Sequence, residues 1–102
     1  MRIAIVNHSR GKRVFSLPPS LIVYGRAIAL TLVQSSNVGA LGFDKDARQL
    51  VVVFKNGAAY LYHHFPETSY VLLMAAPSKG GWLAQHVVGN KAYPYERLPE
   101  VA

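Results

Sequence analysis

Two apolar runs separated by a short polar turn dominate the middle of the chain. Residues 49–55 and 58–63 are rich in Val, Leu, Phe and Tyr, which are residue types that strands favour. The dipeptide Asn56-Gly57 lies between the two runs and is the strongest short-range signal of a β-hairpin. The pattern therefore predicts an antiparallel hairpin across residues 49–63.

The register of this hairpin decides which side chains share a face. A two-residue Asn-Gly turn would pair Lys55 with Ala58, whereas a three-residue loop with Gly57 in the left-handed conformation would pair Phe54 with Ala58. The second register is favoured, because it gathers the bulkiest side chains on one face, where a helix can cover them. That face would carry Leu50, Val52, Phe54, Tyr60 and Tyr62. The opposite face would carry Val51, Val53, Ala59, Leu61 and His63; it is also apolar, so we expect the N-terminal segment or a partner chain to cover it.

Shorter strands are expected before the hairpin and two helices after it. Strands are predicted at residues 1–6, 14–17 and 38–43, with a turn at 44–48. Residues 20–33 mix helix-favouring and strand-favouring side chains, and strands are favoured there. Helices are predicted at 67–76, between Pro66 and Pro77, and at 79–88, after a possible Ser78 cap and before Gly89-Asn90. The fold class predicted is a small α+β domain: an antiparallel meander at residues 38–63, two short helices packed on it, additional N-terminal strands and an extended tail at 92–99.

Length and composition indicate one compact unit. The chain has 102 residues, of which 51% are hydrophobic, so it can build a real core. It has no cysteine, which excludes disulfides, thiolate zinc sites and cysteine nucleophiles. The longest apolar stretch, residues 21–33, is interrupted by Gly25 and Arg26 and is too short to span a bilayer. Because the N-terminus also lacks the features of a signal peptide, we expect a cytoplasmic protein with no membrane partner.

The positive charge is distributed unevenly. The net charge is +6, and residues 1–43 contain no acid. Their basic residues are Arg2, Arg10, Lys12, Arg13 and Arg26. This asymmetry favours a polyanionic partner, although a basic surface kept for solubility would look the same. The polar run at 34–37 is the expected boundary between an N-terminal basic and apolar extension (1–34) and the remaining domain (35–102).

Short motifs follow one another in order through this second part. They are Ser36-Asn37-Val38, Leu41-Gly42-Phe43-Asp44, Leu50-x-Val52-x-Phe54-x-Asn56-Gly57-x-x-Tyr60-x-Tyr62, Phe65-Pro66, Tyr70-x-x-Leu73, Ala75-x-Pro77-Ser78-Lys79-Gly80 and Tyr93-Pro94-Tyr95-x-Arg97-Leu98. Together they resemble the KTSC domain, a small domain found at the C-terminus of some lysyl-tRNA synthetases and as single-domain bacterial and phage proteins. The chain departs from the family at Trp82-Leu83-Ala84, where an aromatic residue, Phe and Asn are usual. The resemblance implies RNA binding only by analogy with the synthetases, and such an analogy does not fix function.

The candidate binding residues are aromatic and basic. Unpaired bases can stack on aromatic rings, and the candidates for such a platform are Tyr60, Tyr62, Trp82, Tyr93 and Tyr95. Phosphates would be held by Arg10, Lys12, Arg13, Arg26 and Arg97. The alternative for the tyrosines is that they pack under the helices with their hydroxyls at the rim. The alternative for the loop at 8–13 is a solvated basic loop.

The sequence gives little support for a catalytic site or a metal site. His63 and His64 are adjacent on a predicted strand and would point to opposite faces, so these two residues and His86 are not expected to bind a metal. The five acidic residues lie in turns, at a helix start and in the tail, and neither a nucleophile–base pair nor a carboxylate pair can be argued. We therefore expect no cofactor and no enzymatic activity.

Two functions from different classes are consistent with the sequence. The first is a non-catalytic nucleic-acid-binding module that prefers RNA or single strands. The second is a protein-interaction or structural accessory subunit, for example of a phage assembly, with a partner or a second copy bound through the N-terminal segment. For the second function, Leu21→Asp or Ile28→Asp is expected to disrupt the assembly.

Overall fold

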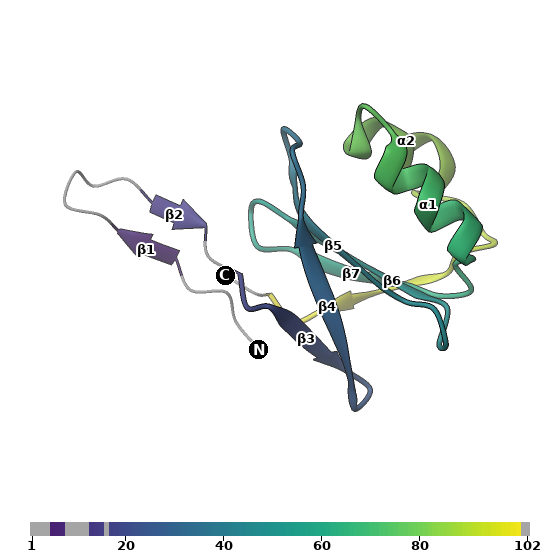
Figure 1. Ribbon diagram of the computed structural model, residues 1–102, viewed down its shortest axis with the longest axis horizontal. Coiled ribbons are helices and arrows are strands. Elements are labelled where there is room, and N and C mark those ends of the chain that lie inside the picture. The colour runs from purple at the N-terminus through teal and green to yellow at the C-terminus, as the bar shows by residue number, and fades with distance from the viewer. Residues whose placement is uncertain (1–4, 8–12, 16, 101–102) are drawn as a thin grey trace.

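The computed structural model describes residues 5–7, 13–15 and 17–100 (Figure 1). Strands β1 (Ile5–Asn7) and β2 (Arg13–Phe15) pair in a two-stranded antiparallel sheet. The larger sheet has six antiparallel strands in the order β3-β4-β5-β6-β7-β8. Its strands are β3 (Ser20–Val23), β4 (Arg26–Leu32), β5 (Val38–Asp44), β6 (Gln49–Phe54), β7 (Ala59–Tyr62) and β8 (Tyr95–Leu98). Helices α1 (Glu67–Ala75) and α2 (Lys79–His86) lie between β7 and β8 in the chain, so the α+β prediction is confirmed.

The N-terminal predictions are met as far as the structure describes that region. β1 and β2 overlap the strands expected at residues 1–6 and 14–17. Residues 1–4, 8–12, 16, 101 and 102 lie outside the described part of the chain. The candidate phosphate ligands Arg10 and Lys12 are among them, and for Arg13 the structure describes only the backbone, as the first residue of β2.

The ambiguous segment at residues 20–33 forms a strand hairpin. Val23 pairs with Arg26 across a two-residue turn, and both turn residues, Tyr24 and Gly25, have positive φ angles of 48° and 77°. Positive φ at both central positions is what the tight type I′ hairpin turn requires. The strand preference of residues such as Val23 therefore prevails over the helix preference of the alanines, because the hairpin buries Leu21, Val23 and Ile28.

The central hairpin adopts the predicted three-residue loop. The Phe54 amide donates to the Ala58 carbonyl over 2.8 Å, and the strand pairs run from Val53–Ala59 to Leu50–Tyr62. Gly57 closes the loop with φ 93°, a conformation that glycine adopts without steric cost. This register confirms that the bulky side chains share one face.

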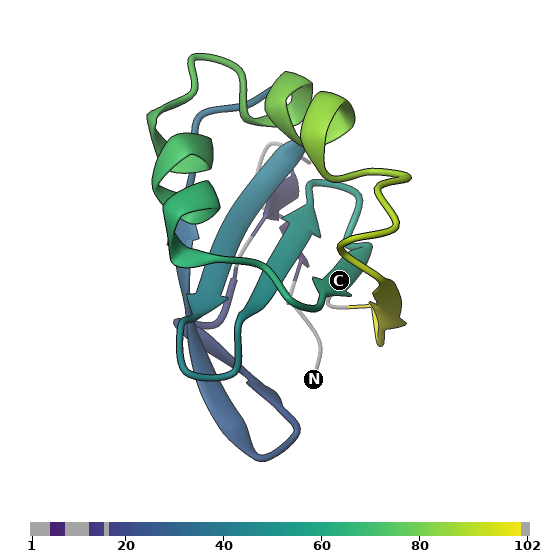
Figure 2. The same ribbon diagram turned by 90° about the vertical axis from the view of Figure 1, so that its right-hand side faces the viewer.

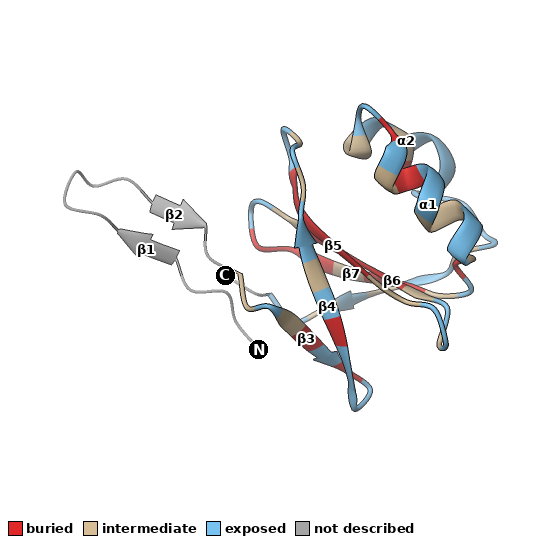
Figure 3. Ribbon diagram, in the orientation of Figure 1, coloured by how far each residue is buried: buried red, intermediate tan, exposed pale blue. Residues whose placement is uncertain are grey.

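The sheet separates two apolar cores. Both helices lie over one face (Figure 2), and the core beneath them contains Val38, Leu41, Leu50, Val52, Tyr62, Phe65, Leu73, Leu83 and Val87. The core on the opposite face contains Leu21, Val23, Ile28, Ala40, Val51, Val53, Ala59 and Leu61. The β3–β4 hairpin of the same chain therefore covers the second face, as expected of the N-terminal segment, and the central strands are buried on both sides (Figure 3).

This packing corrects one expectation. Leu21 and Ile28 are only 3% and 1% exposed, because they face the core between β3–β4 and the rest of the sheet. An aspartate at either position would unfold the domain rather than report on an assembly. Their exposed neighbours on this hairpin are the residues that can test such a role.

The sheet curls until its two edges meet at one end. The Tyr24 hydroxyl, in the β3–β4 turn, donates to Glu96 Oε1 on β8 over 2.6 Å. His63 Nε2 lies 2.8 Å from the other carboxylate oxygen, Oε2. The Tyr24 and His63 hydrogen bonds lower the pKa of Glu96, so this carboxylate stays ionised where it links β3–β4 to β8. Among the described helices, none is long and apolar enough to cross a membrane.

Candidate functional site

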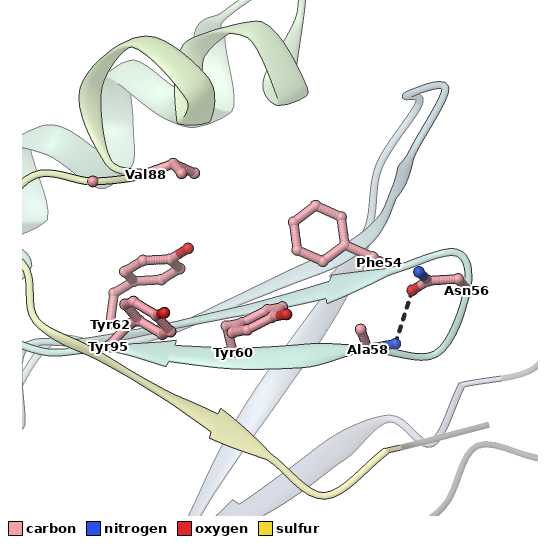
Figure 4. A pocket seen from close by; sticks show the side chains of 8 residues that line it. Phe54, Asn56, Ala58, Tyr60, Tyr62, Val88 and Tyr95 are labelled. Atoms are coloured by element: carbon pink, nitrogen blue, oxygen red, sulfur yellow. Dashed lines mark hydrogen bonds between the residues drawn. The ribbon is translucent and has the colours of Figure 1, made fainter.

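An aromatic cleft lies between the sheet and the end of α2 (Figure 4). Its volume is about 490 Å³, within the ~300–1,000 Å³ typical of ligand sites. It is lined by Phe54, Asn56, Ala58, Tyr60, Tyr62, Val88, Gly89 and Tyr95. We call this set of residues the aromatic cleft.

Strand register brings the aromatic side chains together. Side chains two apart on a strand share a face, so Tyr60 and Tyr62 both point to the helix side of β7. On β8, Tyr95 is paired with Tyr62 and Arg97 with Tyr60, which puts these four side chains on the same face. The Tyr60 ring lies 5.9 Å from the Phe54 ring and 5.8 Å from the Tyr95 ring, both edge to face.

The helices leave this part of the face open. Tyr62 is 6% exposed and belongs to the core beneath α2, whereas Tyr95 on the edge strand is 62% exposed. Tyr60 is half-buried between them. The alternative in which the tyrosines simply pack under the helices therefore describes Tyr62, but not Tyr95.

The hydroxyl of Tyr62 points into the cleft (Figure 4). Burial, and after it the neighbouring hydroxyls of Tyr60 and Tyr95, raise the pKa of Tyr62. Because a phenol already titrates far above neutral pH, this hydroxyl stays protonated and can both donate and accept a hydrogen bond.

Positive charge borders the cleft on β8 and in the loop after α2. The guanidinium carbon of Arg97 lies 5.7 Å from the centroid of the Tyr60 ring, a cation–π geometry. The exposed Lys91 lines an adjoining hollow that shares Gly89 and Tyr95 with the cleft.

The acidic residue on β8 lies on the other side of the sheet. Glu96 is paired with Leu61, which faces the opposite core, and its carboxylate bonds to Tyr24 and His63. The cleft therefore combines apolar rings with cations, and the carboxylate of β8 is directed away from it.

Other predicted aromatic residues have structural positions. Trp82 and Tyr93 pack against the buried Phe65, with ring centroids 6.4 and 5.0 Å from it. Trp82 also contacts His86, one turn further along α2. These contacts hold α2 on the sheet, and of the five predicted aromatic residues the aromatic cleft contains Tyr60, Tyr62 and Tyr95.

Arg26, a predicted phosphate ligand, is engaged elsewhere. Its guanidinium makes a two-pronged ion pair with Asp44 and a longer contact of 3.5 Å with Asp46. The Arg26 pairing, with help from the Ala47 and Asp46 amides, lowers the pKa of Asp44 to about 2. Arg26 thus ties β4 to the β5–β6 turn and is not part of the cleft.

The histidines do not form a metal centre within the described part of the chain. In residues 5–7, 13–15 and 17–100, no three His, Asp or Glu side chains come together as a metal site would require. His63 instead bonds to Glu96, and His86 packs on Trp82.

Sequence reasoning missed several residues of the site. Phe54 was assigned to the correct face but not to a site, and Asn56 was seen only as a turn residue. Lys91 and Val88 gave no such signal, because their position depends on how the chain leaves α2 and returns to the sheet.

Comparisons with known proteins agree with the fold. A family model described as the KTSC domain matches residues 34–93. The crystal structure of a KTSC domain protein from Yersinia pestis is similar to this chain, with 29% sequence identity and a TM-score of 0.64; the match covers 71% of this chain and 99% of that one. A search of curated proteins finds no match.

Proposed function

The chain belongs to the KTSC domain family, and from its aromatic cleft we propose that it is a non-catalytic module that binds single-stranded nucleic acid, with RNA favoured. The observation that carries the proposal is the open group of Tyr60, Tyr62 and Tyr95 with Arg97 over Tyr60. A cytoplasmic setting belongs to the same proposal.

Unpaired bases suit the apolar part of the cleft. Every base has a π-face, and stacking on an aromatic side chain is worth about 1–3 kcal/mol per base. The exposed ring of Tyr95 and the half-buried ring of Tyr60 offer such surfaces. In a duplex the bases are already stacked and paired, so single strands are the better ligand.

The cations around the cleft suit the phosphates of the same strand. Arg97 lies over the Tyr60 ring, and Lys91 lines the hollow that adjoins the cleft. Arg10, Lys12 and Arg13 would add further phosphate contacts, an expectation that comes from the sequence alone. Each phosphate that is neutralised should make binding more sensitive to salt.

The test is binding of the full chain to a fluorescein-labelled single-stranded RNA, followed by fluorescence anisotropy at several salt concentrations. Tyr95→Ala should weaken binding about 5- to 150-fold, the range that one stacked base implies. Arg97→Gln should weaken it and lower the slope of log affinity against log salt by about 0.7.

The matched control is Leu72→Ala. Leu72 is 60% exposed, close to the 62% of Tyr95, but lies on α1 outside the cleft, so its removal should leave RNA affinity nearly unchanged in a variant shown to be folded by circular dichroism. No binding at about 50 mM salt, or equal losses in Tyr95→Ala and Leu72→Ala, would refute the proposal.

A second candidate function is that of a protein-interaction or accessory subunit. The observation that favours it is the exposure of two large apolar side chains on the β3–β4 hairpin, Ile22 and Leu32, which are 60% and 72% exposed. Ile22→Asp and Leu32→Asp each change an exposed surface of this hairpin without entering the core. If this surface mediates self-association, the molar mass measured by light scattering should fall to that of a monomer in these variants.

A further inference from the structure

Tyr24 occupies a turn position that does not suit a tyrosine. It is the first central residue of the β3–β4 turn and has a φ angle of 48°. A type I′ turn favours asparagine, aspartate or glycine at this position, because a residue with a bulky side chain rarely adopts positive φ. The side chain is also 70% exposed, so it adds little to the core. Neither the turn nor the core therefore accounts for a tyrosine here, and its hydroxyl is the group that makes a specific contact.

The Tyr24 hydroxyl joins the two edges of the curled sheet. β3 and β8 are the edge strands of the six-stranded sheet, and the hydroxyl donates over 2.6 Å to Glu96 Oε1 on β8, 72 residues later in the chain. The other carboxylate oxygen lies 2.8 Å from Nε2 of His63, the residue that follows β7. We call Tyr24, Glu96 and His63 the edge latch. Through it, the β3–β4 turn is tied to β8, and β8 is tied to the strand beside it.

The strand that the edge latch holds also carries two residues of the proposed binding surface. β8 has four residues and is an edge strand with β7 as its partner in the sheet. Successive side chains of a strand point to opposite faces, so Glu96 faces the latch while its neighbours Tyr95 and Arg97 face Tyr62 and Tyr60. Short edge strands open locally more readily than central ones. An opening of β8 would displace both the exposed ring of Tyr95 and the guanidinium of Arg97.

We propose that Tyr24 is a positioning residue for the aromatic cleft, and that its hydrogen bond to Glu96 holds β8 where Tyr95 and Arg97 can contact a nucleic acid. This inference rests on the proposed nucleic-acid function and adds to it a residue outside the cleft. Tyr24 acts through Glu96 and does not touch the ligand itself.

The first test is amide hydrogen exchange of the full chain, followed by NMR, in the wild type and in Tyr24→Phe. This substitution removes the hydroxyl, keeps the ring and leaves the net charge unchanged. The β8 amides should exchange about two- to tenfold faster in the variant, the range of one hydrogen bond. The amides of α2, which covers the opposite face of the sheet, are the internal control and should keep their rates. Unchanged rates in β8, or an equal acceleration in α2, would overturn the proposal.

The second test is RNA affinity by the same anisotropy assay. Tyr24→Phe should bind the labelled RNA about two- to tenfold more weakly than the wild type. Tyr24→Asn should lose affinity to the same extent, yet melt no lower than Tyr24→Phe, because asparagine suits the turn better. A residue that served only stability would not separate affinity from melting temperature in this way.

A double variant tests whether Tyr24 acts through β8. Arg97→Gln should cost less affinity in the Tyr24→Phe background than in the wild type, because Arg97 is then no longer held in place. Wild-type affinity in Tyr24→Phe, together with an undiminished effect of Arg97→Gln, would overturn the positioning role and leave the proposed function standing. Absence of RNA binding by the wild type at low salt would overturn both.

Discussion

Replacing Gly42 with alanine should destabilise the domain strongly, because β4 crosses β5 closely at this point. A Cβ atom added at Gly42 would lie 2.7 Å from the Ala29 carbonyl oxygen and 2.9 Å from Ile28 Cγ2. Gly42 pairs with Leu30 of β4 on one side and with Val51 of β6 on the other. The absence of a side chain here lets β4 approach closely enough to bury Ile28 in the core beneath the β3–β4 hairpin.

The loss of stability depends on which atoms the added Cβ atom would contact. The Ala29 oxygen belongs to the backbone of a paired strand, so it cannot move without shifting β4. Overpacking of a core costs about 1–3 kcal/mol, and Gly42→Ala should lie in the upper half of that range. For a domain of this size, such a loss lowers the melting temperature by roughly 10–20 °C.

Gly80→Ala is a matched control for Gly42→Ala, because its new Cβ atom would meet a movable side chain instead of backbone. A Cβ at Gly80 would meet Asn37 Oδ1 at 2.6 Å, a contact as close as the one at Gly42. Asn37, however, is an exposed side chain that can rotate away, and alanine in α2 recovers part of the ~1 kcal/mol that glycine costs in a helix. Gly80→Ala should therefore change the melting temperature by less than about 5 °C.

The assay is thermal unfolding of the wild type and both variants, followed by circular dichroism, with urea unfolding to obtain free energies. If Gly42→Ala melts within a few degrees of the wild type, β4 does not approach β5 in the protein as closely as the structure shows. Equal destabilisation of the two variants would refute the argument that the backbone obstacle determines the cost.

Three further outcomes are expected. Leu61→Ala, in the core under β3–β4, should cost about 2–5 kcal/mol in urea unfolding, whereas Leu72→Ala on the exposed face of α1 should cost less than about 0.5 kcal/mol. Ser78→Ala should cost about 1 kcal/mol, because the Ser78 hydroxyl accepts the Gly81 amide at the start of α2; an unchanged stability would contradict the cap. The pKa of Asp44 is lowered to about 2 by Arg26, so the stability that Asp44 contributes is fully present above pH ~4, its unfolded value, and is lost as pH falls towards 2. Urea titrations from pH 5 to pH 2 should show a smaller loss in Asp44→Asn than in the wild type, and parallel curves would disprove this linkage.

Much of the sheet could be predicted from local patterns. Asn56-Gly57 marked the central hairpin, and alternation along the flanking runs identified the face that the helices cover. Ser78 marked the start of α2, where its hydroxyl caps the helix. Each of these signals depends on residues within a few positions of one another, so the chain needs no distant contact to express them.

The partners of the charged and aromatic side chains could not be predicted in this way. Arg26 was assigned to phosphate, yet it pairs with acids eighteen and twenty residues later. Trp82 and Tyr93 were predicted to stack on bases, and the structure places both against Phe65 and outside the aromatic cleft. The tail was expected to be extended, and its pairing with β7 as strand β8 was not foreseen.

The amino-acid sequence by itself determined the fold class, the register of the central hairpin and the existence of two apolar faces, because periodicity and turn chemistry act over short distances. The tertiary structure decided which tyrosines share a cleft, which cations stand beside them and which segment covers the second face. Those outcomes depend on β8 returning to pair with β7 after more than thirty residues, and on β4 bending over Gly42. Contacts between such distant residues are set by how the whole chain packs, which no local pattern encodes.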